Sequence, residues 1–410
     1  MEISGLIYLM LSGILFLKNR MYIFFLFICS ANFFASSFIN FSGKGIPLYI
    51  IGEIFLILVL LSKWKGNFSL ISTAEVYFLF FIIWSTMVLV VSPGLFPNLQ
   101  VSIDPDDLVM NGGRPNPSIF NFAQVVYLLI HYICFSLIIR CKKNNYGVRY
   151  ELSFEKIIIL LSWITCSFGF ISYASRVFGV SDVLIPLFYN NPGYAQLIDA
   201  ALRFQAGFPE ASFCGAFLGA AFWVAFFHKR ILLACVIVIA MLLSVSGTAL
   251  ISFFTGFCLY TFYYGRKKLI ITLIVIVFLY IFLDLLGVLD YALAFIQDKG
   301  NSHSGDVRYS QAILALNIVK ETYGLGIGMG ITRGGGGLLN LMATTGIIGS
   351  LIFICFLVAT LKKQRFDKVL YILSLLAAMV FTIPDISYPV LWAGIFLVAA
   401  TREGANKSEM

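Results

Sequence analysis

Charged side chains are scarce in this sequence. Asp, Glu, Lys and Arg make up 12% of its 410 residues, whereas hydrophobic residues make up 60%. A typical soluble domain has about 25% charged and roughly 45–50% apolar residues. Because no water-soluble fold could bury this much apolar side chain, the composition excludes a soluble domain and predicts an integral membrane protein.

Signals of secretion and of metal binding are also missing. The apolar stretch from Ile3 to Leu17 follows Glu2 instead of a basic leader, and no small-residue cleavage site follows it. We therefore interpret it as a membrane span and not as a signal peptide. The eight cysteines lie in apolar segments, apart from Cys141 in a basic loop. They fit neither a disulfide framework nor a metal-ligand cluster, and we expect no cofactor and no required metal.

Long apolar runs recur along the whole chain. A spanning helix needs about 20 apolar residues, and we identify about thirteen such segments. They lie near residues 2–17, 21–39, 46–62, 74–92, 119–139, 156–178, 210–227, 231–246, 248–264, 269–287, 338–360, 369–383 and 388–401. The predicted fold is all-α, a polytopic helical bundle that forms one integral membrane domain over residues 1–410.

The distribution of basic residues follows membrane topology. A net charge of +8 could indicate nucleic-acid binding. If the loops alternate with the amino terminus outside, however, 20 of the 28 basic residues lie on the cytoplasmic side. This bias is the positive-inside rule, so we expect no nucleic-acid partner. The eight outer basic residues are Lys44, Arg114, Arg176, Arg203, Lys299, Arg308, Lys320 and Arg333.

The apolar segment from Ile231 to Tyr264 is too long for one helix and has basic residues at both ends. Both ends should then face the cytoplasm. A helical hairpin that turns at 244–248 (SVSGT) satisfies this requirement. Glycine breaks the helix there, and the hydroxyl groups can satisfy the freed backbone groups.

Three long loops, at 93–118, 181–209 and 288–337, fall on the outer side, whereas the inner loops are short. Loops carry function disproportionately, so we expect the outer face to be the active one. Arginine supplies five of the eight outer basic residues. Its planar guanidinium suits phosphate and carboxylate groups, although snorkelling to the lipid interface is the alternative for any single arginine.

Residues 203–212 (RFQAGFPEAS) join the second long loop to a span. Pro209 suits the first turn of the following helix, and Glu210 would lie near the positive end of that helix. Glu210 either caps the helix, orients Arg203, or acts as the general base for a hydroxyl nucleophile.

The third long loop predicts an amphipathic surface helix. Residues 302–306 (SHSGD) give helix-start signals, and Arg308 would lie in the first turn. His303 is the only histidine expected outside, and it is a second candidate for acid/base work unless it is simply solvated. Apolar residues recur at helical spacing after it: Tyr309, Ala312, Ile313, Leu316 and Val319.

A glycine-rich run, GLGIGMG at 324–330 and ITRGGGG at 331–337, directly precedes a span. Glycine leaves backbone amides exposed, and exposed amides beside a helix amino terminus can bind an anion. Arg333 lies in the same run. The run is not a nucleotide P-loop, because it lacks the Gly-Lys-Ser/Thr ending. A flexible hinge is the alternative.

Three charged residues fall within or near predicted spans. Glu53 lies in the middle of one, and Asp284 and Arg176 lie near outer helix ends. Charges at such depth usually face the protein interior and mark a pathway or a binding cavity, unless they pair with one another. Arg176 is therefore a further candidate for substrate binding.

The order of these segments resembles the O-antigen polymerase and ligase superfamily of bacterial polysaccharide assembly, and looks most like its Wzy-type polymerases. The resemblance is carried by RFQAGFPEAS at 203–212, LLSVSGTAL at 242–250, and GDVRYSQAILAL, GLGIGMG and LLNLMATTGIIGS within 305–350. It covers roughly residues 200–350, whereas the first half matches only as a run of spans.

The resemblance implies transfer of a glycan from undecaprenyl pyrophosphate to the sugar hydroxyl of another lipid-linked repeat unit, at the periplasmic face of the bacterial inner membrane. By motif position it assigns pyrophosphate binding to Arg203 and Arg308, with Arg333 and Arg176 as further candidates. The expected partners are an undecaprenyl-pyrophosphate-linked oligosaccharide, membrane lipid and a chain-length-regulating copolymerase.

Two alternatives stay open. Ligases of this superfamily usually carry a His-Asn pair where this chain has Gly335-Gly336, and the missing histidine argues against a ligase. The family's Glu-Pro-Ser-like motif reads Pro-Glu-Ala-Ser here, which leaves the role of Glu210 open. A transporter or flippase would also have many spans, but the candidate helix break at 244–248 has no matched partner in the other half.

Overall fold

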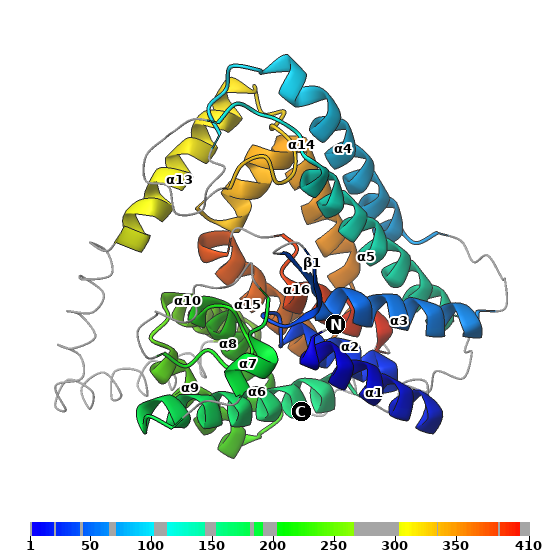
Figure 1. Ribbon diagram of the computed structural model, residues 1–410, viewed down its shortest axis with the longest axis vertical. Coiled ribbons are helices and arrows are strands. Elements are labelled where there is room, and N and C mark those ends of the chain that lie inside the picture. Colours follow the sequence, from blue (N-terminus) through cyan, green and yellow to red (C-terminus); the bar gives the residue numbers. More distant parts are fainter. Residues whose placement is uncertain are drawn as a thin grey trace.

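The computed structural model describes residues 2–19, 22–41, 44–64, 71–101, 113–143, 153–180, 184–191, 203–265, 303–333, 335–383 and 386–401. Helices are the main elements of this part of the chain (Figure 1). They are α1 (Ile3–Lys18), α2 (Tyr22–Ala31), α3 (Leu48–Lys63), α4 (Thr73–Leu95), α5 (Ile119–Lys143), α6 (Phe154–Val177), α7 (Leu184–Phe188), α8 (Ala211–Phe227), α9 (Ile231–Ser244), α10 (Gly247–Tyr264), α13 (His303–Glu321), α14 (Gly337–Leu361), α15 (Phe366–Thr382) and α16 (Pro389–Ala400). Two short strands are β1 (Ser37–Phe41) and β2 (Lys44–Pro47).

The helices lie where the long apolar runs are. Eleven of the thirteen predicted segments coincide with a helix, and the segment 269–287 lies outside the described residues. Of the described helices, α4, α5, α6 and α14 are long and apolar enough to cross a membrane. α4 packs against both α5 and α14, and Figure 1 shows the three helices near one another. The helical fold is confirmed, and the number of spans stays a prediction.

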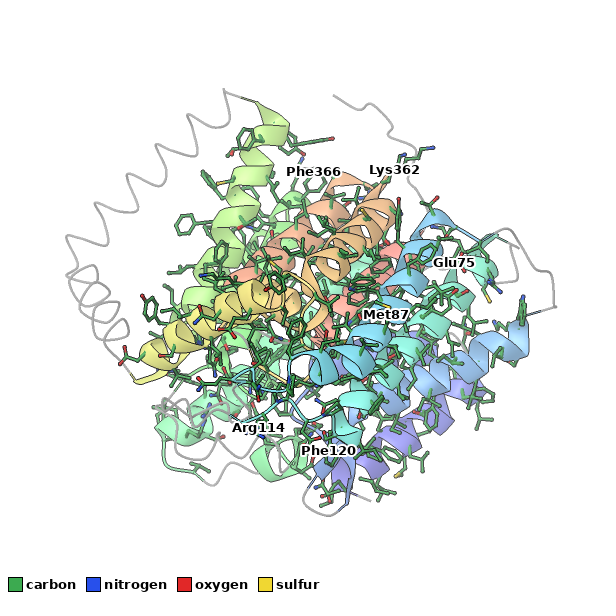
Figure 2. All side chains as sticks on the ribbon, turned by 90° about the horizontal axis from the view of Figure 1, so that it is seen from above. Glu75, Met87, Arg114, Phe120, Lys362 and Phe366 are labelled. Carbon is green, nitrogen blue, oxygen red and sulfur yellow. The ribbon has the colours of Figure 1, made fainter. Side chains whose placement is uncertain are left out.

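The bundle has two chemically different ends. Figure 2 shows Lys362 and Phe366 at one end and Arg114 and Phe120 at the opposite end. We call the first the lysine end; α5, α14 and α16 end there. We call the second the arginine end; α6 ends there, and α8, α14 and α16 begin there.

The second predicted span, 21–39, is wrong in its second half. α2 ends at Ala31, and β1 pairs antiparallel with β2 in a hairpin. Polar side chains after α2 explain why the helix stops. Ser36 Oγ, for example, donates to the Phe188 carbonyl at the end of α7 at 2.7 Å, and the backbone amide of Ser37 donates to Asn190 Oδ1 at 2.8 Å instead of to a helical carbonyl.

The predicted turn between the two arms of the 231–264 hairpin is confirmed. α9 ends at Ser244, Val245 adopts a left-handed conformation with φ 46°, and α10 begins at Gly247. α10 then packs closely on α8, where Ser252 Oγ donates to the Ala216 carbonyl at 3.1 Å. α8, α9 and α10 therefore form one packed group, drawn in green in Figure 1.

The loop after α13 is fixed to α14 through backbone hydrogen bonds. The amide of Ile327 donates to the Ala343 carbonyl at 2.9 Å, and the amide of Gly328 donates to the Thr344 carbonyl at 2.9 Å. α14 is interrupted at Gly346, where φ is 75°, so carbonyls before the kink need new donors. These amides are therefore not bared to an anion, contrary to our expectation for this half of the glycine run.

α13 packs on α14 with a face other than the predicted one. Val307, Leu314 and Ile318 are buried. Tyr309 and Leu316, which belong to the predicted apolar stripe, are 69% and 51% exposed. The predicted helix is present as α13. Its packing on α14 determines which face is buried, and sequence periodicity could not identify α14 as the neighbour.

Three helices meet in a charged cluster at the lysine end. The ring nitrogens of His228, which follows α8, lie 3.1 Å from Glu155 of α6 and 3.0 Å from Asp367 of α15. The Arg365 guanidinium lies 3.0 Å from the same Asp367 carboxylate. Asp367 precedes the predicted span at 369–383. Burial acts to raise the pKa of its carboxyl, but the hydrogen bond with His228 and the charge of Arg365 together lower it.

Gly326→Ala should destabilise the protein. Gly326 has a φ of 82°, which strains any side chain, and a Cβ would collide with the amide of Gly346. We expect a loss of roughly 1–3 kcal/mol, read as a lower melting temperature in detergent. Gly13→Ala in α1 is the matched control, because nothing lies within 4 Å of that Cβ position. Equal melting temperatures for the two variants would contradict the packing described.

Asp367→Asn should remove the stability that the charged cluster provides. The folded carboxyl has a pKa below its ordinary value of 3.8. Its ionised form therefore stabilises the fold above that pH, and the contribution is lost as pH falls through the folded pKa. We expect a deficit of about 1–3 kcal/mol at neutral pH. Thermal unfolding should show that this deficit shrinks below pH 3.8; a deficit independent of pH would argue against the cluster.

Candidate functional site

The segment before α8 is held in place by buried aromatic side chains. The amide of Phe204 donates to the Leu243 carbonyl at the end of α9 at 3.1 Å. Phe204 and Phe208 are both fully buried. Arg203 and Glu210, at either end of this buried stretch, are only partly buried. The phenylalanines thus position two of the residues that the sequence analysis selected.

The structure brings two of the predicted arginines together. Arg176 lies in the last turn of α6, and its guanidinium donates to the backbone carbonyl of Arg203 at 2.9 Å. Its Nε also donates to the Ser172 carbonyl at 3.4 Å. Neither arginine forms an ion pair with any described residue. A guanidinium group without a carboxylate partner is suited to bind a phosphate group.

Glu210 occupies the residue before α8, but its carboxylate does not cap the helix. Its backbone is extended, and its side chain makes no capping hydrogen bond. Instead, Ser212 Oγ donates to Glu210 Oε2 at 2.8 Å. Glu210 also makes no ion pair with Arg203. The capping and orienting roles are thus not supported, and a carboxylate oriented by one hydroxyl is suited to accept a proton.

The second pair of predicted arginines lies on adjoining segments. Arg308 is partly buried in the second turn of α13, not in the first, because the helix already begins at His303. A Cβ at Gly335 would collide with the Arg308 carbonyl, so the segment that begins α14 packs directly on α13. Arg333, two residues before Gly335, is exposed. The side chain of His303 lies outside the described residues.

Both arginine pairs border the arginine end of the bundle. The Tyr388 hydroxyl, before α16, donates to the Phe213 carbonyl in the first turn of α8 at 2.8 Å. Gly337, at the start of α14, packs on the carbonyls of Met379 and Ile383 at the end of α15.

A buried pair inside the bundle was not identified from the sequence. Glu53 of α3 and His131 of α5 are both fully buried, and the His131 Nδ1 lies 2.8 Å from Glu53 Oε2. The imidazole stacks on Trp392 with ring centroids 4.6 Å apart. The sequence left open a pairing of Glu53 with Arg176 or Asp284. Arg176 instead contacts Arg203, and Asp284 lies outside the described residues. Polar residues in the middle of two apolar runs were the available signal.

The arginine end therefore combines guanidinium groups suited to an anion with a carboxylate suited to accept a proton. The pair Glu53 and His131 provides ionisable groups within the bundle. No protein-family model, no curated protein and no solved structure matches the chain.

Proposed function

We propose that the chain is a multi-pass protein of the bacterial inner membrane, with the arginine end on the periplasmic side. Large apolar side chains are exposed on the candidate spans, among them Phe80 (54%) and Val90 (60%) of α4 and Leu351 (55%) and Val358 (62%) of α14. A soluble protein rarely exposes so much apolar surface, whereas lipid would cover it. About thirteen spans and three long periplasmic loops belong to this proposal.

At the periplasmic face, the protein transfers a glycan from undecaprenyl pyrophosphate to the sugar hydroxyl of another lipid-linked repeat unit. The observation that carries this proposal is the contact between the Arg176 guanidinium and the backbone of Arg203. Glu210 lies seven residues after Arg203, directly before α8. Unmatched guanidinium groups favour a pyrophosphate ligand, and the carboxylate favours an acceptor hydroxyl. The motif resemblance supports the same activity.

The proposed step forms one bond and breaks one. The acceptor oxygen attacks the anomeric carbon of the donor while Glu210 takes the hydroxyl proton. The bond between the anomeric carbon and the pyrophosphate oxygen breaks, and undecaprenyl pyrophosphate leaves with the electron pair. Arg176 and Arg203, with Arg308 and Arg333 on the adjoining segments, neutralise the negative charge that develops on the leaving group.

Polymerase activity is favoured over ligase activity by the residues before α14. Gly335 and Gly336 stand where a ligase of this superfamily has its His-Asn pair. Both are buried against neighbouring backbone, Gly335 on α13 and Gly336 on the carbonyl of Val380. This position has no room for a catalytic side chain. A polymerase would use a chain-length-regulating copolymerase as its partner.

The buried pair of Glu53 and His131 favours a second candidate, a proton-coupled transporter of a lipid-linked oligosaccharide. Ionisable residues inside spans often belong to proton relays. His131 Nε2 is buried without a hydrogen-bond partner among the described residues, so a relay would need a further acceptor there. Glycan elongation by purified protein in detergent, where transport cannot occur, would exclude transport as the sole activity.

Arg203→Ala and Arg308→Ala should each abolish elongation. Removing one group that stabilises a developing charge typically costs about 100- to 1000-fold in turnover. Insertion should be unaffected, because both residues are only partly buried. Arg230→Ala at the lysine end, where Arg230 is 59% exposed, is the matched control. Ladder length on a gel and protein yield in the membrane fraction measure both effects. Normal polymerisation by both variants would place the site elsewhere.

Glu210→Gln should lower turnover by about 100- to 10,000-fold, because the amide cannot accept the hydroxyl proton. The backbone start of α8 and the melting temperature should not change. Ser212→Ala is the control, since it removes the hydrogen bond to the carboxylate but keeps its charge, and it should have a much smaller effect. If His303→Ala is inactive and Glu210→Gln is active, the base is His303.

A further inference from the structure

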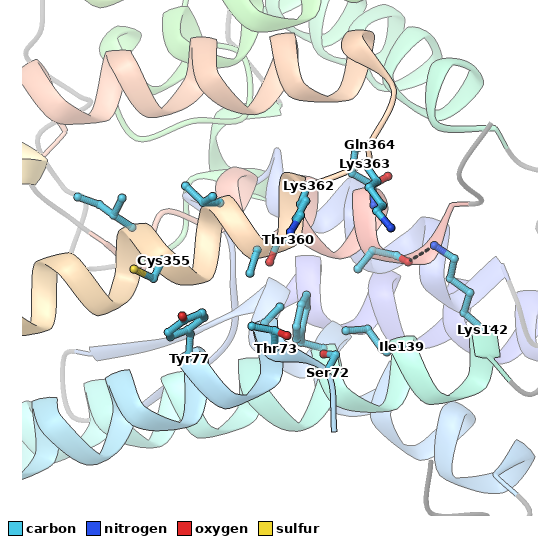
Figure 3. Close-up of a pocket in the computed structure, with 16 residues that line it drawn as sticks. Ser72, Thr73, Tyr77, Ile139, Lys142, Cys355, Thr360, Lys362, Lys363 and Gln364 are labelled. Carbon is cyan, nitrogen blue, oxygen red and sulfur yellow. Dashed lines mark hydrogen bonds between the residues drawn. The ribbon is translucent and has the colours of Figure 1, made fainter. Parts of the chain in front are cut away.

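A pocket opens at the lysine end, between the start of α4, the end of α5 and the end of α14 (Figure 3). Its volume is about 930 Å³, within the range of small-molecule binding sites. Lys362 and Lys363 reach it from the end of α14, and Lys142 reaches it from α5. The pocket lies far from the arginine end, so the proposed transfer reaction does not account for it.

The charged side chains that line this pocket within the described part of the chain are of one sign. Three lysines and no carboxylate are among them. Glu75, in the first turn of α4, does not line it; its carboxylate accepts a hydrogen bond from Ser136 at 2.6 Å and lies 3.6 Å from Arg140. Two lysines after a helix end are ordinary, because they offset the helix dipole. A third lysine from another helix in the same cavity points to an anionic ligand.

Lys142 is held at the pocket by the end of α16. Its ammonium group donates to the Ala399 carbonyl at 3.1 Å and to the Thr401 carbonyl at 2.8 Å. The hydrogen bond to Ala399 is drawn in Figure 3. These bonds fix the position of the ammonium group at the pocket. Lys362 and Lys363 are exposed, and replacing them does not disturb this anchor.

The wall of the pocket away from the lysines is apolar. Ile354 and Val358, one turn apart on α14, line it and are 43% and 62% exposed. Tyr77 of α4 lines the facing side. The basic rim at the helix ends suits the headgroup of a phospholipid. The apolar face that continues from it along the helices suits the acyl chains. A soluble anion would need the rim alone.

We propose that this pocket binds an anionic phospholipid of the cytoplasmic leaflet. Its phosphate lies between Lys142, Lys362 and Lys363, and its acyl chains lie along Ile354 and Val358. Basic pockets between spans on the cytoplasmic side suit anionic headgroups. The inference rests on the proposed membrane insertion but not on the proposed glycan transfer. The bound lipid would join the ends of α5 and α14.

The test uses the full-length protein purified in neutral detergent. Native mass spectrometry compares phosphatidylglycerol with phosphatidylethanolamine of the same acyl chains, and we expect retention of phosphatidylglycerol alone. Each lysine near an anionic headgroup contributes about a factor of five. Lys362→Gln/Lys363→Gln should therefore weaken binding roughly 30-fold. Lys18→Gln/Lys229→Gln is the matched control, because both lysines are exposed and neither lines the pocket.

Equal retention of the two lipids, or an equal loss in both double variants, would overturn the proposal. Displacement of the lipid by millimolar inorganic phosphate would identify a site for a free anion instead. Val358→Trp fills the apolar side without changing charge and should also weaken binding; unchanged binding would contradict the placement of the acyl chains. If the protein elongates the glycan but binds neither lipid selectively, the lipid-binding inference is refuted and the proposed glycan transfer is not.

Discussion

Each buried carboxylate of the described helices is matched by a basic group on another part of the bundle. An unpaired buried charge costs several kcal/mol, and the lipid environment that we propose offers no water to reduce that cost. Such pairs therefore restrict which helices can lie side by side. Glu53 with His131 joins α3 to α5, Glu75 with Arg140 joins α4 to α5, and Asp367 with His228 joins α15 to the end of α8.

The arginine end departs from this rule. Arg176, Arg203, Arg308 and Arg333 form no ion pair with the described residues, and in the proposed function their charge serves a ligand. Arg203, Arg308 and Glu210 could be selected from local motifs, because the surrounding residues mark loops and helix starts. The contact from Arg176 could not be predicted, since it depends on how α6 packs beside the segment before α8. The same is true of the pairing of His131 with Glu53.

Helices were easier to predict than the contacts between them. Apolar runs predict α4, α5, α6 and α14, and the SVSGT stretch predicts the turn between α9 and α10, because both features are local. The end of α2 at Ala31 depends on bonds to distant partners such as Phe188. The covered face of α13 and the hydrogen bonding of the glycine run depend on α14. Tertiary packing thus determined each of these differences.

The most direct test of the account is whether the purified protein polymerises a lipid-linked glycan. Undecaprenyl-pyrophosphate-linked repeat units would be supplied in detergent without nucleotide or added metal, and the products separated on a gel. The account predicts a ladder of increasing chain length. A single product on added lipid A core would indicate a ligase. No product from protein that retains a cooperative melting transition would contradict the proposed activity.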